Sequence, residues 1–374
     1  MKCGPLAGSI SFIPATCGHP AQPNHIGSIN SLSGSTKCSE EIPKFQKCAF
    51  IEYIKFYIHQ LHGKISTMKA AYLEEYGSPA VLKFGNVPDP VPGADEVLVD
   101  IHAASVNAAD WKVRLGSYKP AKDFPYILGR DFSGVIRAIG ENVDDLYIGD
   151  AVFGVCDVGQ EGAYAEKIAV KASIITKKPD QLSHIDAAAL ALAGLTAVVS
   201  IEDTLMLQSG EKILIQGGAG GVASFGIQLA KHIGSHVITT ASANNHEFVA
   251  SLGADEIIDY NAKDFSEIVS DCDAVFDTVG GNVVERSFAI LKPGGRAAFI
   301  ASGVQAPESP RNDVLSLRPK VSRDRSHLER IIELVEAGAV KVPAISLFPL
   351  SAAAEAHRIS EARHLRGKLV FEVR

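Results

Sequence analysis

The chain has 374 residues, of which 46% are apolar, and it carries a formal net charge of −7. This length is enough for one large domain or, as we expect, two ordinary domains that each bury a core. The acidic balance and the lack of a Lys or Arg block argue against nucleic acid as a main partner, because a phosphate backbone demands clustered positive charge. We find no apolar run close to the ~20 residues that cross a bilayer, so we expect no membrane partner.

The first 67 residues differ in composition from the rest of the chain, because they contain no arginine and hold four of the six cysteines. Pro14 interrupts the only stretch that could serve as a secretory signal, and the missing arginine counts against an import presequence. Residues 45–61 could form a short amphipathic helix that docks on the core or on a membrane surface. We favour a different interpretation, in which residues 1–67 are a poorly ordered extension and Met68 is the functional start.

Only two cysteines, Cys156 and Cys272, follow Met68. Neither has a cysteine neighbour at the spacing of a metal site or a redox motif. A reducing compartment of the cytoplasmic type is the simplest interpretation for this part of the chain.

From Met68 to about Asp186 the pattern indicates short strands separated by Pro, Gly and Asp turns. The predicted strands are 68–72, 96–102, 132–139 and 151–155. These runs predict an all-β, partly barrel-like domain with few helices.

The strongest local signal is an apolar run that breaks into glycines and resumes with helical spacing. Ile213 to Ile215 have the β-branched character of a parallel strand buried on both faces. After the glycines, one helix face is formed at three-and-four spacing by Val222, Phe225, Gly226, Leu229, Ala230 and Ile233. The sequence therefore predicts a strand, a tight turn and a helix.

Within this turn, Gly218, Gly220 and Ala223 fit the pattern G-x-G-x-x-G/A. The first glycine allows the tight turn, the second lets backbone N–H groups approach a pyrophosphate, and the third small residue lets the helix pack on the strand. Helix N-termini attract anions. We prefer dinucleotide binding to the alternative of a plain strand-to-helix turn.

Beyond the turn, strands and helices alternate along the chain. We expect further strands at 236–241, 256–260, 273–277 and 296–300, a helix at 327–336 and a closing strand at 369–373. This alternation predicts an α/β fold with a doubly wound parallel sheet that binds its cofactor across the carboxyl ends of the strands.

The end of the second strand indicates which dinucleotide is bound. An NAD enzyme usually carries Asp or Glu there to hold the ribose 2′-OH, but residues 240–246 read Thr-Ala-Ser-Ala-Asn-Asn-His. Ser242 and Asn245 offer donors and no carboxylate repels a 2′-phosphate, which favours NADP(H). The alternative is that these are ordinary loop residues, since the stretch holds no Lys or Arg.

Several segments also occur in a characteristic order, namely 106–118, 128–135, 149–152, 162–166 and 193–197, followed by the glycine turn. In this order they resemble the medium-chain dehydrogenase/reductase superfamily, in its zinc-independent quinone oxidoreductase and enone (alkenal) reductase branch. The resemblance covers about Met68 to Arg374. It implies a GroES-like catalytic domain made of residues 68–186 and 320–374, around a Rossmann NADP-binding domain of residues 187–319.

The same resemblance indicates whether the chain has the ligands of a catalytic zinc ion. Ala108-Ala109 stands where a zinc-dependent relative places its cysteine ligand, and Gly129-Arg130-Asp131 replaces Gly-His-Glu. A catalytic zinc needs about three protein ligands, and the histidines after Met68 are scattered. We therefore predict no metal.

The cofactor-binding residues combine the glycine pattern with positions implied by the resemblance. Tyr260 corresponds to a tyrosine that contacts the 2′-phosphate in bacterial quinone reductases, and Thr196 lies where the family holds the nicotinamide. The predicted set is Thr196, Gly218, Gly220, Gly221, Val222, Ser242, Asn245, Tyr260, Val279, Ser302 and Gly303.

Four residues are candidates for catalysis by the same resemblance: Asn107, Asp110, Lys112 and Tyr118. The Lys112 ammonium could hydrogen-bond the substrate carbonyl or the nicotinamide ribose, and Tyr118 could donate a proton or line the pocket. The structural alternatives are that Asn107 braces the loop, Asp110 caps a short helix and Lys112 is a solvated surface charge.

The resemblance thus implies an NADPH-dependent oxidoreductase that reduces a quinone or the activated C=C bond of an enone or alkenal. Two alternatives are an NADPH-binding regulatory or structural protein and, disfavoured by the missing zinc ligands, an alcohol dehydrogenase. We expect a small-molecule substrate and a possible homodimer. The identity of the substrate depends on loops such as residues 305–311.

Overall fold

A computed structural model of the protein describes residues 66–117 and 123–374. The chain divides into two units, Met1–Gly63 and Lys64–Arg374, and the description below concerns the second. The predicted N-terminal extension lies almost entirely outside the described residues, and Tyr118 lies outside them as well.

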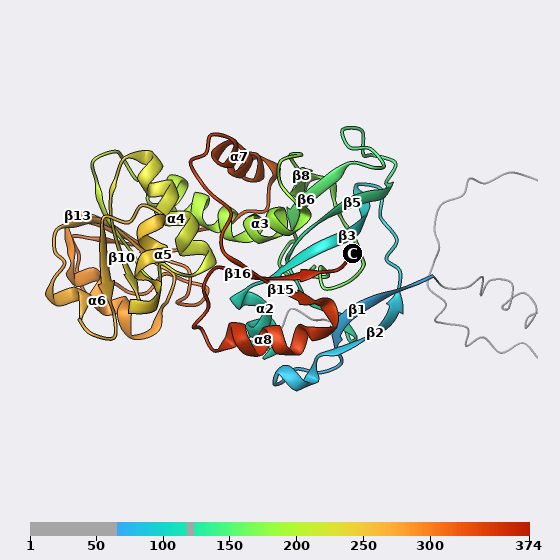
Figure 1. Ribbon diagram of the computed structural model, residues 1–374, viewed down its shortest axis with the longest axis horizontal. Coiled ribbons are helices and arrows are strands. Elements are labelled where there is room, and N and C mark those ends of the chain that lie inside the picture. Colours follow the sequence, from blue (N-terminus) through green and yellow to red (C-terminus); the bar gives the residue numbers. More distant parts are fainter. Residues whose placement is uncertain (1–65, 118–122) are drawn as a thin grey trace, which may run out of the picture. The chain divides into compact units, whose positions relative to one another are not determined.

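The second unit contains two large sheets and one small one (Figure 1). The strands are β1 (Thr67–Leu73), β2 (Lys83–Pro88), β3 (Glu96–Val106), β4 (Tyr126–Ile127), β5 (Asp131–Ile139), β6 (Ala151–Val155), β7 (Lys167–Lys171), β8 (Ile175–Lys177), β9 (Lys212–Ile215), β10 (His236–Ala241), β11 (Glu256–Asp259), β12 (Cys272–Asp277), β13 (Leu291–Phe299), β14 (Leu315–Leu317), β15 (Ile345–Pro349) and β16 (Lys368–Glu372). The helices are α2 (Ala108–Arg114), α3 (His184–Val198), α4 (Gly221–Ile233), α5 (His246–Ser251), α6 (Val284–Ala289), α7 (Arg325–Glu336) and α8 (Ala353–Glu361).

The β-rich part contains a seven-stranded sheet, with the order β15-β16-β3-β5-β6-β8 and with β7 paired to β3, and a three-stranded sheet β2-β1-β4. β3 buries alternate residues along most of its length, as a strand with one face on a core requires. The predicted strands of this part are all present. β16 pairs antiparallel with β3, with Leu369 opposite Val106. The bounds of the two predicted domains stay a prediction.

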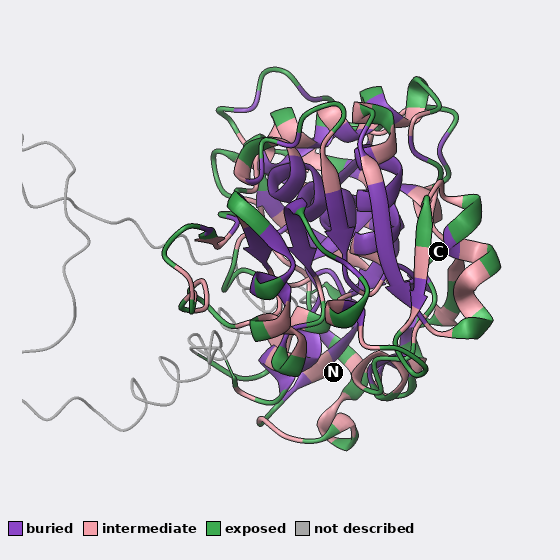
Figure 2. Cartoon of the chain, turned by 90° about the vertical axis from the view of Figure 1, so that its left-hand side faces the viewer, coloured by how far each residue is buried: buried purple, intermediate pink, exposed green. Residues whose placement is uncertain are grey.

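The other large sheet has six strands in the order β11-β10-β9-β12-β13-β14, and every neighbouring pair is parallel. Ile213, Leu214 and Ile215 of β9 are fully buried, as expected for a central strand covered on both faces. Figure 2 shows the buried residues gathered in the interior and the exposed ones on outer helix faces and loops. The predicted combination of a doubly wound parallel sheet with a β-rich part is confirmed.

The fifth strand of this sheet starts earlier than predicted. We expected it at residues 296–300, but β13 begins at Leu291. The register shifts between the pairs Cys272–Leu291 and Ala274–Arg296, and Gly294 has a φ of +80°. Gly294 and Gly295, which the sequence pattern suggests as a turn before the strand, therefore lie within β13 at a bulge.

α3 lies between the two large sheets, and it packs on β3, β5 and β6 as well as on α4 and α7 (Figure 1). It opens with a capping box in which Ser183 and Asp186 satisfy each other's backbone N–H groups. The described part of the chain holds one helix long and apolar enough to cross a membrane, His184–Thr204, and 83% of its most apolar window is buried inside the protein. Our expectation that no apolar run approached this length was wrong, because a core helix that is covered on all sides is apolar all round.

Candidate functional site

The glycine turn connects β9 to α4 and is held by the neighbouring strand β10. Gly217 has a φ of +72°, its N–H donates to Thr240 Oγ1 at 3.0 Å, and Gly218 N–H donates to the Thr240 carbonyl oxygen at 2.9 Å. A Cβ atom on Gly218 would lie 2.3 Å from Thr239 Oγ1, a distance that no packed side chain adopts. The backbone of this turn therefore requires glycine at both positions.

Gly220 is the N-cap of α4, so the predicted binding residues Gly221 and Val222 form the first turn of that helix. The N–H groups of a first turn have no acceptors within the helix, and the helix dipole makes this end positive. α4 has 13 residues, long enough for this field to develop. The turn can hold a phosphate or diphosphate.

At the end of β10 the structure adds a residue that the sequence did not indicate. Arg366 donates from Nε to Asn245 Oδ1 at 2.7 Å and from one terminal nitrogen to the Asn244 carbonyl oxygen at 2.7 Å. Its guanidinium carbon lies 5.5 Å from the ring centroid of Phe248. Residues 240–246 themselves hold no Lys or Arg, but in the folded chain Arg366 supplies a positive charge beside Asn245.

The C-terminal segment reaches this place because it runs along the glycine turn. Gly367 N–H donates to the Ala219 carbonyl oxygen at 2.8 Å, and Gly367 forms a parallel bridge with Gly220. A Cβ atom on Gly367 would lie 1.9 Å from the Ala344 carbonyl oxygen, so only glycine permits this approach. Arg366 and Lys368, on either side of Gly367, are thereby placed next to the turn.

The remaining predicted cofactor residues lie around the parallel sheet. Thr196 is buried in α3 and donates to the Leu192 carbonyl oxygen at 2.7 Å. Tyr260 follows β11 and is half exposed, and Val279 follows β12, where Asp277 Oδ1 accepts from Val279 N–H at 2.7 Å. Ser302 and Gly303 follow β13. The loops after β11, β12 and β13 all leave the carboxyl edge of the sheet.

Two buried polar atoms lack a hydrogen-bond partner among the described residues and fit a dinucleotide site. They are Ser302 Oγ, after the strand β13, and Gln216 Nε2, directly before the glycine turn. Buried polar groups are normally satisfied. Orphaned groups at this edge, together with the glycine cradle, are what a site built to receive a polar ligand requires.

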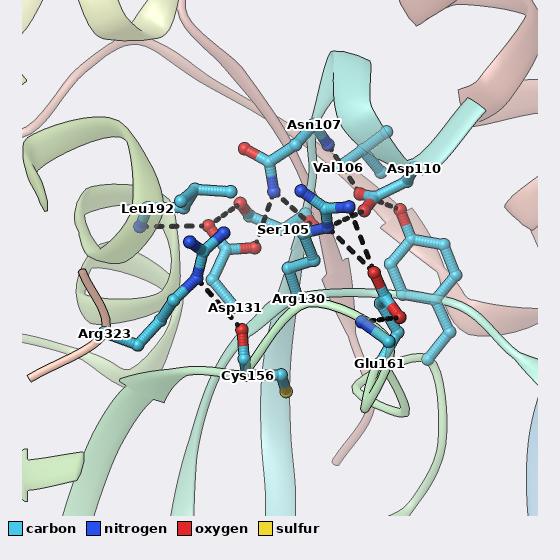
Figure 3. A network of polar contacts seen from close by, with 12 residues as sticks. Ser105, Val106, Asn107, Asp110, Arg130, Asp131, Cys156, Glu161, Leu192 and Arg323 are labelled. Atoms are coloured by element: carbon cyan, nitrogen blue, oxygen red, sulfur yellow. Dashed lines mark hydrogen bonds and ion pairs between the residues drawn. The ribbon is translucent and has the colours of Figure 1, made fainter. Parts of the chain in front are cut away.

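A buried polar cluster lies where α2 follows β3 (Figure 3). Asp131, at the start of β5, is fully buried and accepts hydrogen bonds from Ser105 Oγ at 2.8 Å, Asn107 Nδ2 at 2.8 Å and Leu192 N–H at 3.3 Å. The Asn107 side chain also accepts from Lys368 Nζ at 2.6 Å. Asn107 is therefore fixed on both sides of its amide, which is the geometry that the structural alternative for this residue, bracing of the loop, requires.

Asp110 is fully buried in α2, and its Oδ2 accepts from Asn107 N–H and from Tyr164 OH, each at 2.8 Å. The contact with Asn107 N–H closes a capping box at the start of the helix. This is the geometry that the structural alternative for Asp110, a helix cap, requires. Burial raises the pKa of Asp110 to about 7, against the opposing charge of Arg130. Arg130 is itself paired with Glu161 at 3.0 Å.

Lys112 is half buried rather than fully solvated. Its Nζ lies 5.7 Å from the ring centroid of Trp111, and the Arg363 guanidinium carbon lies 5.5 Å from the same centroid. Burial and the nearby charges of Arg363, Arg318 and Arg130 lower the pKa of Lys112. Among the described residues no carboxylate lies within ion-pair distance of its ammonium.

Over residues 66–117 and 123–374, no group of three or more His, Cys, Asp or Glu side chains is arranged to hold a metal ion. Asp131 makes hydrogen bonds to Ser105 and Asn107 instead. That the protein uses no metal stays a prediction.

Comparison with known proteins identifies the family of this fold and site. Residues 93–180 match the family model described as alcohol dehydrogenase GroES-like domain, and residues 252–371 match the one described as zinc-binding dehydrogenase. The chain is 37% identical over 288 residues to a 2-methylene-furan-3-one reductase of Solanum lycopersicum, covering 74% of this chain and 71% of the relative. It is 34% identical over 315 residues to the chloroplastic NADPH-dependent alkenal/one oxidoreductase of Arabidopsis thaliana, covering 81% and 79%.

Among solved structures, the quinone oxidoreductase from Coxiella burnetii superimposes with a TM-score of 0.79 at 36% identity, covering 83% of this chain and all of the other. The chain belongs to the medium-chain dehydrogenase/reductase superfamily, in its quinone oxidoreductase branch. The β-rich part is thus the GroES-like component of a medium-chain reductase, and the parallel sheet is its Rossmann component.

Three residues of this medium-chain reductase site were missed by sequence reasoning, namely Arg366, Lys368 and Asp131. Asp131 was considered only as a replacement for a zinc ligand. Arg366 and Lys368 lie at the start of the closing strand, where no local pattern indicates contact with a turn so far away in sequence. Gly367, between them, was the one available signal of a close backbone approach.

Proposed function

We propose that the protein is an NADPH-dependent reductase of small molecules that reduces the activated C=C bond of an enone or alkenal, or a quinone. The observation that carries this proposal is the Arg366 guanidinium beside Asn245, at the end of a strand that bears no carboxylate. Arginine recognises phosphate through parallel N–H donors. A 2′-phosphate, and hence NADPH, is the ligand whose chemistry fits this place.

The cofactor's diphosphate would lie on the first turn of α4, at Gly220, Gly221 and Val222. Ser242, Asn245, Tyr260 and Arg366 would hold the adenosine 2′-phosphate. The nicotinamide half would lie toward Thr196, Val279, Ser302 and Gly303, where the buried Ser302 hydroxyl offers a hydrogen bond to a carboxamide. When bound, NADPH supplies the hydride that reduces the substrate.

The chain's own contribution is to orient the substrate and stabilise the charge that develops on its oxygen. We assign this role to Lys112, whose ammonium would donate to the carbonyl oxygen and stay paired with it as the oxygen becomes an enolate. The half-buried position strengthens this interaction, because charges attract more strongly away from bulk water. Asn107 would shape the same place, and Tyr118 is proposed to line the pocket or donate a proton.

Asp110 has a structural part in this proposal. It closes the helix cap that positions α2, and so it positions Lys112 two residues further along. A strong acid near the substrate is unnecessary, because the enolate can take its proton from water.

The enzyme proposal is tested by adding NADPH and then 2-alkenals, vinyl ketones and quinones to the purified protein while cofactor absorbance is followed. We expect saturable NADPH consumption with at least one of these classes. Tight NADPH binding with no consumption by any of them would favour the alternative of a regulatory or structural NADPH-binding protein. Zinc-stimulated oxidation of alcohols would favour an alcohol dehydrogenase instead.

We also propose a homodimer and a cytoplasmic location. The edge strand β14 carries the exposed side chain of Leu315, and an exposed strand edge is a common place for a second copy to pair. The Arabidopsis relative is chloroplastic by name, so cell fractionation is the deciding measurement for the compartment, and light scattering after gel filtration is the deciding one for the dimer.

A further inference from the structure

Lys368, the first residue of β16, connects the glycine turn to the polar cluster around Asn107. Its side chain is almost fully buried. A Cβ atom on Gly221 would lie 2.6 Å from Lys368 Cδ and 2.9 Å from Cγ, so the aliphatic stem lies directly against the start of α4. The far end of the same side chain donates from Nζ to Asn107 Oδ1 at 2.6 Å and to the Val106 carbonyl oxygen at 3.1 Å.

A buried ammonium is stable only when its donors are matched and its charge is balanced. Two of the three Lys368 donors have the acceptors just named, and Asp131 Oδ2 lies 3.9 Å from Nζ. Burial lowers the pKa of Lys368, while Asp131 and Asp110 oppose that shift. The ammonium is thus held in one position by surrounding groups that are themselves buried or part-buried.

The side-chain amide of Asn107 is held between a cation and an anion. Its oxygen accepts from Lys368 and its nitrogen donates to Asp131 Oδ1 at 2.8 Å. Asn107 is also the N-cap of α2, the helix that carries Lys112. A change at the Lys368 ammonium therefore reaches the start of that helix.

We propose that Lys368 is a positioning residue that holds the glycine turn and α2 at a fixed distance from each other. Its aliphatic stem packs against Gly221, and its ammonium orients Asn107. This inference rests on the proposed function, in which the turn holds NADPH and α2 carries Lys112. Lys368 itself has no direct role in the chemistry.

Two substitutions separate the stem from the ammonium. Lys368→Met keeps a stem of similar length against Gly221 and removes the charge, whereas Lys368→Ala removes both. We expect Lys368→Met to lower kcat about 10- to 100-fold through misplacement of α2, with the NADPH dissociation constant changed less than about twofold. We expect Lys368→Ala to lower kcat similarly and also to weaken NADPH binding several-fold. Lys341→Met, at an exposed lysine, is the matched control.

Calorimetric titration of each variant with NADPH, thermal unfolding without cofactor and steady-state turnover supply the three readouts. Wild-type kcat in Lys368→Met, or a loss of kcat that matches only the unfolded fraction, would overturn the proposal. Equal NADPH affinity in Lys368→Met and Lys368→Ala would overturn the part that concerns the stem. If the wild-type protein binds NADPH and turns over no enone or quinone, the proposed function fails, and the affinity comparison still decides the stem.

A second experiment covers the case in which Lys368→Met fails to fold because Asp131 is left unpaired. Lys368→Met combined with Asp131→Asn removes both charges and carries the same kcat prediction. Gly221→Ala keeps both charges but brings a methyl group into the Lys368 stem. We expect the effect of Lys368→Ala on NADPH affinity to be smaller in the Gly221→Ala background, since the collision has then been removed. Additive effects would contradict the contact.

Discussion

Arg366 and Asn245 are 121 positions apart in the sequence, yet Arg366 Nε donates to Asn245 Oδ1 at 2.7 Å. The contact forms because Gly367 binds the backbone of the glycine turn at Ala219. In the proposed function, the positive charge that selects a 2′-phosphate is thus supplied by Arg366 of the C-terminal segment and not by the loop after β10.

Replacing Arg366 with Ala is therefore expected to weaken NADPH binding about 10- to 100-fold, since a charge-assisted hydrogen bond contributes about 1.5–3 kcal/mol. NADH, which lacks the 2′-phosphate, should bind the variant and the wild type alike. Calorimetric titration with both cofactors measures this. Arg358→Ala, at an exposed arginine of α8, is the control. An equal loss for both cofactors would mean that Arg366 supports the turn and does not select the phosphate.

Gly218 and Gly220, two of the glycines of the turn, should respond differently to a methyl group. Gly218→Ala collides with Thr239 Oγ1, and we expect it to destabilise the fold by about 1–3 kcal/mol and to weaken NADPH binding. In Gly220→Ala the nearest atom is the Gly217 carbonyl oxygen at 3.4 Å, so stability should be kept while affinity falls, because the methyl occupies the space of the diphosphate. Urea unfolding and NADPH titration distinguish the two; unchanged affinity in Gly220→Ala would place the diphosphate elsewhere.

Asp110 makes stability depend on pH. Its pKa is raised to about 7 by burial, above its unfolded value, so the folded chain binds more protons than the unfolded chain between about pH 4 and about pH 7. The stability contributed by this proton is present at low pH and is lost as pH rises through that window. Asp110→Asn keeps an acceptor for Asn107 N–H and Tyr164 OH and does not titrate.

We therefore expect the free energy of unfolding of the wild type to fall relative to that of Asp110→Asn as pH rises through this window. Urea titrations at several pH values across it provide the measurement. If the two proteins change in parallel, Asp110 does not take up a proton on folding.

Lys112→Met should lower kcat about 100-fold, the magnitude typical for removal of one donor to a developing oxyanion, and should leave NADPH affinity nearly unchanged. Lys112→Arg should retain part of the activity, because the cation is kept but its shape differs. Trp111 is the single tryptophan of the chain and lies beside Lys112, so we expect its fluorescence to change when a ligand binds next to Lys112. A loss of affinity with normal kcat would assign Lys112 to the nicotinamide ribose.

Local patterns predicted most of the fold. The strand at Ile213 to Ile215, the glycines after it and the helix from Gly221 follow rules that act over a few residues, and the structure has them in place. β10 occupies the predicted residues His236–Ala241. β13 was predicted too short because glycines are typical of both bulges and turns. Only the pairing of β13 with β12 shows that these glycines form a bulge within the strand.

The site was less predictable because its contacts are long-range. Asn107 and Asp110 lie within one local motif and were predicted as candidates, although the capping geometry of Asp110 favours a structural role. Arg366 and Lys368 reach the site only through the pairing of β16 with β3 and the docking of Gly367 on the turn. No spacing rule within one segment specifies such an approach.

The central claim is that NADPH bound at the glycine turn reduces an activated double bond. It is tested most directly with NADPH that carries deuterium at the transferable position of the nicotinamide, mixed with the protein and a vinyl ketone. We predict a saturated ketone with one deuterium at the β carbon, formed in proportion to the cofactor consumed. Recovery of unchanged labelled NADPH and unchanged vinyl ketone, alkenal and quinone from the same protein would contradict the claim.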